Sequence, residues 1–250
     1  MGNNSKVLLM ASPAISAPML HEIQQADEVF LHLPLEEYQT EVNNEEADQV
    51  QSNAEKYSFV LYGNLRNAKH LVEWADGDSL TDIFPDAVHL ALDKPTADFL
   101  EDHSVPAIMP REQAKPIDLL EFMLRISREG SSLYPCTDQK AEELPGLLQE
   151  LEMKVDEFTV CSEMSLSKDR LNELRKEAEN EVIGTVLLHN RSAVNRFGAA
   201  FPDLDLKSKT VISGSSGVTK ILIDMGIEPD YEAEGNWYSI ASLIKEKIIS

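Results

Sequence analysis

The sequence has little cysteine, few basic residues and no long apolar run, and each scarcity excludes a class of protein. Its two cysteines, Cys136 and Cys161, are too few and too far apart for a disulfide framework or a metal motif. The 22 basic residues face 44 acidic ones, and a formal charge of −22 argues against nucleic acid or an anionic membrane as a partner. No apolar stretch could span a bilayer, and the first residues lack a signal-peptide pattern. We therefore expect a cytoplasmic protein without a bound metal.

The C-terminal third repeats one pattern: a short apolar run, a polar turn and an amphipathic helix. Residues 182–188 are the first apolar run, residues 189–192 the turn, and residues 194–201 carry apolar side chains on one helical face. The same order recurs within residues 210–225. Strand-turn-helix units in series imply right-handed crossovers and a parallel sheet. The turns then gather at the carboxyl edge of that sheet, where folds of this kind bind ligands.

A similar pair of units lies earlier in the chain, within residues 58–107. Asn64 and Asn190 occupy matching turns 126 residues apart. Two further pairs have nearly the same spacing, Leu100 with Leu222 at 122 and Pro106 with Pro229 at 123. We interpret this regularity as an internal duplication that produces two similar α/β halves.

The remaining strands suggest how the halves are completed. Apolar runs near the N-terminus, at residues 6–11 and 28–33, can add to the sheet of the second half. Residues 1–35 would then fold with residues 166–250 as one discontinuous lobe, while residues 38–161 form the other. The predicted fold class is α/β, with two similar doubly wound parallel-sheet lobes, two crossing segments and a cleft between the lobes.

Three segments are the best parts of a resemblance to a known family that covers essentially the full length of the chain. Residues 133–160 (LYPCTDQKAEELPGLLQELEMKVDEFTV) are similar to the family's strand-Pro-Arg-acid-helix segment. Residues 186–197 (VLLHNRSAVNRF) match its strand ending in a Thr-Ser-x-x-Ala-Val turn, and residues 211–248 resemble its closing segment. The family that these segments resemble is uroporphyrinogen-III synthase.

The chain departs from the family pattern at several loop positions. His189-Asn190 stands where the family has Thr-Ser, and Cys136 where it has an arginine. Cys161 aligns with the family's tyrosine, a proposed acid. Tyr62, Tyr231 and Tyr238 lie near expected turns and could supply a proton instead, but the sequence selects none of them, so the catalytic residues are left unassigned.

The resemblance implies a carbon-oxygen lyase of heme biosynthesis. Such an enzyme cyclises hydroxymethylbilane, a linear tetrapyrrole, with inversion of ring D and loss of water, and it uses no cofactor or metal. We expect it to act as a monomer. A second interpretation keeps the fold without the activity: a non-catalytic two-lobed binding protein or pseudoenzyme, which the lost loop residues favour.

A substrate with many carboxylates needs helix N-termini, hydroxyls and cationic side chains. The loop at residues 213–217 could cradle a carboxylate or be an ordinary tight turn. Arg66 and Arg191, in corresponding turns, could clamp carboxylates or form surface ion pairs. Asn64 and Asn190 could bind ligand or satisfy their own turns, and Ser239 could be a helix cap. The candidate substrate-binding residues are Ser12, Asn64, Arg66, Lys94, Thr96, Asn190, Arg191, Ser192, Ser215, Ser216, Gly217 and Ser239.

Overall fold

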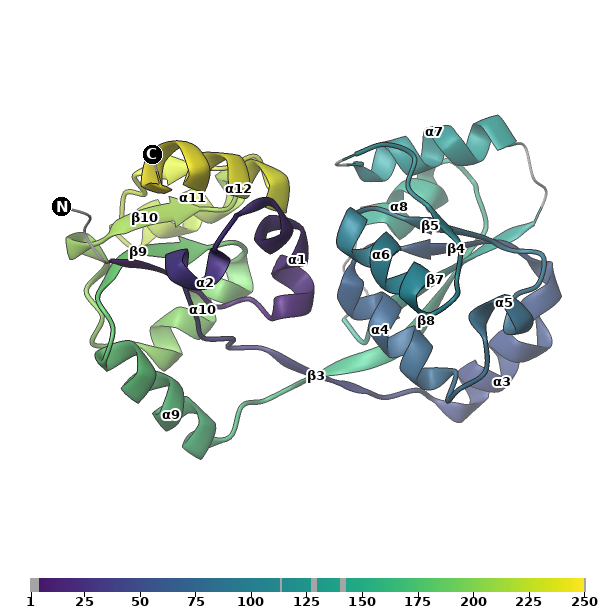
Figure 1. Cartoon of the computed structure of the whole chain (residues 1–250), viewed down its shortest axis with the longest axis horizontal. Coiled ribbons are helices and arrows are strands. Elements are labelled where there is room, and N and C mark those ends of the chain that lie inside the picture. Colours follow the sequence, from purple (N-terminus) through teal and green to yellow (C-terminus); the bar gives the residue numbers. More distant parts are fainter. Residues whose placement is uncertain (1–4, 113, 127–129, 140–142, 250) are drawn as a thin grey trace. The chain divides into compact units, whose positions relative to one another are not determined.

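The chain divides into two compact units in the computed structural model, which describes residues 5–112, 114–126, 130–139 and 143–249. Unit 1 comprises residues 1–37 and 165–250, and unit 2 comprises residues 38–164. In Figure 1 the purple, green and yellow segments belong to unit 1 and the blue and teal segments to unit 2. That each unit folds as an independent domain stays a prediction.

Unit 1 is built on a five-stranded sheet in the order β11-β10-β9-β1-β2, and each neighbouring pair is parallel. Its strands are β1 (Lys6–Leu9), β2 (Phe30–His32), β9 (Ile183–Leu188), β10 (Thr210–Ser213) and β11 (Tyr231–Glu232). Its helices are α1 (Pro13–Glu22), α2 (Ala26–Val29), α9 (Lys168–Glu179), α10 (Arg191–Ala200), α11 (Ser216–Asp224) and α12 (Trp237–Ile244). Short helical turns add η2 (Leu206–Ser208) and η3 (Lys245–Ile249).

Two apolar layers sandwich this sheet. Leu9 of β1 and Leu187 of β9 point to one face, where Met19 of α1 and Ile240 of α12 cover them. Val186 belongs to the opposite layer, which α9, α10 and α11 complete. The alternation of side chains along each strand thus buries both faces, as a doubly wound parallel sheet requires.

One expected strand of unit 1 is shorter than predicted. The sequence predicts an extended strand over residues 28–33, but Glu28 and Val29 belong to α2. Gln25 adopts a left-handed conformation, with φ 55°, and its carbonyl accepts hydrogen bonds from the N–H groups of Glu28 and Val29. This local turn competes with strand pairing, so β2 begins only at Phe30.

Unit 2 contains a six-stranded sheet in the order β3-β8-β7-β4-β5-β6. Its strands are β3 (Glu37–Thr40), β4 (Tyr57–Tyr62), β5 (Val88–Ala91), β6 (Ala107–Ile108), β7 (Ser131–Thr137) and β8 (Val155–Met164), and Glu37 of β3 is the last residue of unit 1. Its helices are α3 (Asn44–Ser52), α4 (Leu65–Trp74), α5 (Leu80–Ile83), α6 (Lys94–Asp102), α7 (Pro116–Ile126) and α8 (Glu143–Glu150), with the short turn η1 (Ala54–Lys56). One face packs against α3 to α6, and the other against α7 and α8.

The duplication is visible in the topology. In unit 2 the run β4-α4-β5-α6-β6-α7 follows the same path as β9-α10-β10-α11-β11-α12 in unit 1. Asn64 precedes α4 and Asn190 precedes α10, each as the N-cap. The fold class predicted from the sequence, two similar parallel-sheet α/β units, is confirmed.

Candidate functional site

Three turns of unit 1 meet at the carboxyl edge of its sheet. Because β10, β9 and β1 are neighbouring parallel strands, the turns that follow them lie side by side. Ser12 follows β1, His189 and Asn190 follow β9, and Gly214 follows β10. We call Ser12, His189 and residues 215–217 the rim site.

The turns after β9 and β10 pack so closely that only glycine fits at position 214. A Cβ atom on Gly214 would lie 2.3 Å from the carbonyl oxygen of His189, well inside contact distance. The Gly214 N–H also donates to the Leu188 carbonyl over 2.9 Å. Gly214 therefore fixes the position of the His189 backbone at this edge.

His189 is partly exposed as a residue, but its ring nitrogens are buried and have no hydrogen-bond partner among the described residues. Its imidazole stacks on the Trp237 ring, with centroids 4.9 Å apart and planes 30° apart. Both ring nitrogens are buried and unpartnered. Burial lowers the pKa of His189 to about 4, and the positive charge of Arg196 contributes in the same direction. The ring is therefore neutral at pH 7, with one N–H donor and one acceptor nitrogen.

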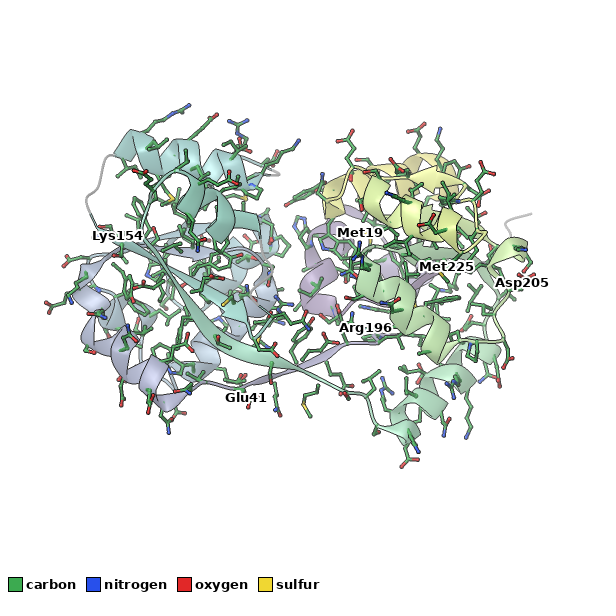
Figure 2. All side chains as sticks on the ribbon, turned by 180° about the vertical axis from the view of Figure 1, so that it is seen from behind. Met19, Glu41, Lys154, Arg196, Asp205 and Met225 are labelled. Atoms are coloured by element: carbon green, nitrogen blue, oxygen red, sulfur yellow. The ribbon has the colours of Figure 1, made fainter. Side chains whose placement is uncertain are left out.

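Glu36 links the start of α1 to α10. Its Oε1 accepts the Ser12 N–H over 3.0 Å, and its Oε2 pairs with Nη1 of Arg196 over 2.8 Å. Arg196 lies on α10, as Figure 2 shows. Because Glu36 is 3 % exposed, its charge is compensated within the protein rather than by water.

The helix N-termini of unit 1 differ in how they are capped. Asn190 caps α10, because its Oδ1 accepts the Ala193 N–H over 2.7 Å. Ser215 and Ser12 are the N-caps of α11 and α1, but neither makes a side-chain capping bond. The Ser12 hydroxyl is moreover buried without a partner. Glu36 already places a carboxylate on the Ser12 N–H at the start of α1, so the N-terminus of α11 is the better position for an external anion beside the end of β9.

The corresponding edge of unit 2 is occupied by the protein's own side chains. Asn64 caps α4 through a 3.0 Å bond from the Asn67 N–H. Asp93 caps α6, accepting from the Thr96 N–H at 2.9 Å and from the Thr96 hydroxyl at 2.7 Å. Asp93 and Thr96 are both buried. A carboxylate of the chain itself thus already sits at the α6 N-terminus.

Lys94 and Arg66 are also engaged within unit 2. Lys94 forms an exposed 2.7 Å ion pair with Asp98, and this hydrogen bond raises the pKa of Lys94. Arg66 is 9 % exposed, and its guanidinium lies 4.5 Å from the centroid of the Tyr38 ring. Its Nε donates to Asn67, whose Nδ2 donates to the Pro135 carbonyl of β7. The contacts of Arg66 therefore connect α4 to β3 and β7.

Arg66 and Arg191 lie in corresponding turns, as the sequence predicts, but not at corresponding positions within them. Arg191 is the first residue of α10 and is exposed, whereas Arg66 is the second residue of α4 and is buried. Alignment on the caps Asn64 and Asn190 places Arg191 opposite Leu65 instead. Adjacent residues of a helix point in different directions. The one-residue offset therefore places Arg66 on the buried side of α4.

The serines predicted for the site fall into two groups. Ser192 is exposed in the first turn of α10, and Ser216 is exposed beside Gly217 at the start of α11. Ser239, by contrast, is not a helix cap as the sequence suggested, because Asn236 caps α12. The Ser239 hydroxyl donates to the Asn236 carbonyl and accepts from the Glu234 N–H, so it stabilises the preceding turn.

Burial argues against Tyr62 as the proton donor of the site. Tyr62 is fully buried, its hydroxyl lies 2.9 Å from Nδ1 of His89, and burial raises its pKa well above the usual value. Cys161 is buried as well. Sequence reasoning did not select His189, although a histidine at the carboxyl end of a buried parallel strand was the available signal.

The described residues hold neither a metal-binding cluster nor a membrane-spanning helix. Within residues 5–112, 114–126, 130–139 and 143–249, no group of histidine, cysteine and acidic side chains has the arrangement needed to hold a metal ion. Over the same ranges, no helix combines the length and apolar character of a bilayer-spanning segment.

Comparisons with known proteins agree with the fold. The uroporphyrinogen-III synthetase from Helicobacter pylori superimposes with a TM-score of 0.62 at 16 % identity, over 97 % of this chain and 99 % of that one. A mutant uroporphyrinogen III synthase from Thermus thermophilus gives 0.52 at 13 % identity, over 96 % and 98 %. The comparison with curated proteins gave no match. The model of the uroporphyrinogen-III synthase HemD family matches residues 17–245, and the chain therefore belongs to that family.

Proposed function

We propose that the chain is a uroporphyrinogen-III synthase, a carbon-oxygen lyase that cyclises hydroxymethylbilane with inversion of ring D and loss of water. The family match over residues 17–245 is the observation that carries this proposal. We further propose that it acts as a cytoplasmic monomer in heme biosynthesis. No cofactor is needed for a reaction without net oxidation or reduction.

The rim site of unit 1 supports the proposal because it suits a substrate with many carboxylates. The exposed first turn of α11 presents Ser216 and Gly217, and its N-cap serine makes no competing side-chain bond. Arg191 adds an exposed cation at the start of α10. Fixed N–H groups at helix ends attract anions without needing to reorganise on binding.

The proposed reaction does not require a strongly nucleophilic side chain. When the carbon-oxygen bond of the hydroxymethyl group breaks, hydroxide leaves and takes up a proton to become water, and the chain of pyrroles holds a delocalised cation. The substituted α-carbon of the distal ring attacks this cation and forms a spiro centre bonded to two methylene carbons. The original bond from this centre to the neighbouring ring's methylene then breaks, which moves the positive charge to that methylene. The unsubstituted α-carbon of the distal ring attacks it, and loss of a proton from that carbon restores the pyrrole and leaves ring D inverted. Holding the folded substrate and stabilising this charge can supply much of the acceleration.

An isomer assay tests the proposed activity. Purified protein is supplied with hydroxymethylbilane, and the cyclised product is oxidised and resolved into its isomers. The synthase produces the type III ring, whereas spontaneous closure gives only type I. Formation of type I alone at high protein concentration would refute the synthase activity.

A non-catalytic member of the same fold is the second candidate, and Cys161 favours it. This buried cysteine occupies the position of the family's tyrosine, and a thiol with no exposed surface is poorly suited to replace a phenol that touches substrate. The same assay separates the candidates when combined with a binding measurement. A pseudoenzyme binds a tetrapyrrole but leaves the isomer distribution unchanged.

A further inference from the structure

His189 has a chemical feature that its packing does not explain. Both ring nitrogens are buried, and neither has a hydrogen-bond partner among the described residues. Buried polar atoms without partners cost free energy, so proteins keep few of them without a purpose. An apolar ring at this position could stack on Trp237 equally well. The two ring nitrogens of His189 therefore indicate a hydrogen-bond partner from outside the chain.

The surroundings of His189 identify the charge of that partner. The uncapped N-terminus of α11 follows the turn that packs on the His189 backbone, and its partial positive charge favours an anion. The N-terminus of α1, on the other side of β9, already has the Glu36 carboxylate on its Ser12 N–H. The charged group that acts on the ring is Arg196 of α10, while α12 contributes the uncharged Trp237 and the β10 turn contributes the Gly214 backbone. Glu36 already neutralises Arg196 through their ion pair.

A carboxylate is the anion that best fits these groups. It accepts several hydrogen bonds at once, and the available donors are backbone N–H groups, the Ser12 hydroxyl and an imidazole N–H. On the basis of the proposed synthase function, we propose that the rim site binds one carboxylate of the tetrapyrrole, and that His189 hydrogen-bonds it while taking up a proton from solvent.

Contact with the carboxylate requires the ring to rotate, because both of its nitrogens are buried. His189 as a whole is partly exposed although its two nitrogens are not. A half-turn about the Cβ–Cγ bond exchanges each nitrogen with a ring carbon and leaves the ring plane against Trp237. This terminal torsion is broad for histidine, so the rotation is inexpensive.

Proton uptake follows from the charge of the ligand. In the free protein the imidazole is neutral at pH 7, because burial lowers the pKa of His189 to about 4. A carboxylate beside the ring favours the charged imidazolium and raises that pKa. Between the free and bound pKa values, binding must therefore consume a proton and become tighter as the pH falls.

Calorimetry on the full chain tests this coupling. The probe is uroporphyrin III, a stable oxidised macrocycle that keeps the acetate and propionate side chains of the family's product. Titrations at pH 6 in two buffers of different ionisation enthalpy give the number of protons taken up. We expect uptake by the wild type, and an affinity that improves by about 10-fold from pH 8 to pH 5.5.

Three variants separate a ligand contact from a structural role. His189→Phe keeps the stacked ring but should lose both proton uptake and pH dependence, with binding weakened about 10-fold at pH 6. His189→Asn can still hydrogen-bond, and should bind without taking up a proton. His103→Phe, at an exposed histidine of unit 2, should behave as the wild type. Thermal unfolding of each variant confirms that it is folded.

The outcomes distinguish this proposal from the function on which it rests. Proton uptake that persists in His189→Phe, or failure of the wild type to bind uroporphyrin III, overturns the role of His189. If the wild type makes the type III ring but binds without proton uptake, only the His189 proposal is lost. If proton-coupled binding is found but only the type I ring forms, the synthase activity is lost and the rim site stands.

Discussion

Arg196 and Glu36 form an ion pair across unit 1, with 2.8 Å between Nη1 and Oε2, and Glu36 is 3 % exposed. The pair joins α10 to the segment that leaves β2, and the same carboxylate accepts the Ser12 N–H. A buried carboxylate of this kind depends on its partner, because removing the cation leaves an uncompensated charge.

Arg196→Met should therefore destabilise the protein by about 2–4 kcal/mol. Lys245→Met is the matched control, since the Lys245–Glu22 pair lies at the surface of the same unit and should change stability by no more than about 1 kcal/mol. Urea unfolding measures both. Equal effects of the two substitutions would contradict the distinction between buried and exposed pairs.

Stability should fall in mild acid because the folded state holds two histidines, His89 and His189, in the neutral form. Burial lowers the pKa of His89 and of His189 to about 4. In the unfolded chain both titrate near the usual value of about 6.5, so the unfolded state binds more protons and stability is lost as the pH falls from about 6.5 to 4. Each should contribute about 2 kcal/mol of loss at pH 5. Urea titrations at pH 7 and pH 5 check this, and His189→Phe should remove its share of the difference.

Two substitutions at Asn190 separate capping from ligand binding. Asn190→Ala removes the bond to the Ala193 N–H and should cost about 1 kcal/mol. Asn190→Asp keeps a capping oxygen and should retain the stability, but it adds a negative charge beside the rim site and should raise KM for an anionic substrate. Unfolding curves and steady-state kinetics on the two variants provide the comparison. A similar KM in both would argue against an anion at this edge.

Arg191 and Arg66 should respond differently to replacement by alanine. Arg191 is exposed, so its loss should leave stability within about 0.5 kcal/mol while raising KM, with a smaller effect at high salt. Arg66 is buried against Tyr38 and holds Asn67, so Arg66→Ala should lower stability by about 2 kcal/mol. Unfolding in urea and kinetics at two salt concentrations distinguish a ligand-facing cation from a structural one.

The fold was predictable from the sequence because its signals are local and repeated. Asn64 and Asn190 mark the start of equivalent helices, and both act as N-caps. Gly226 follows α11 with φ 75°, the left-handed conformation expected after a helix. Such features depend on a few neighbouring residues, so they can be identified without knowledge of the tertiary structure.

The site was less predictable because it depends on burial and on partners distant in sequence. The sequence predicts the Thr96 hydroxyl as a ligand contact, but this hydroxyl donates its hydrogen bond to the Asp93 carboxylate. Arg66 and Arg191 look alike in sequence, yet one is buried and the other exposed. The importance of His189 comes from Trp237 and Gly214, which no sequence pattern connects to it.

Replacement by phenylalanine should change stability in opposite directions at His189, for which we propose a ligand, and at His89, which pairs with Tyr62. His189→Phe removes two unpartnered buried nitrogens while preserving the stack on Trp237, so it should raise stability by about 1–2 kcal/mol at pH 7. His89→Phe takes away the hydrogen-bond partner of the buried Tyr62 hydroxyl and should lower stability by about 1–3 kcal/mol. Urea unfolding at pH 7 decides the sign of each change. Residues that destabilise the folded state while serving a ligand are expected to show the first pattern, and a loss of stability in His189→Phe would instead mark that histidine as part of the packing.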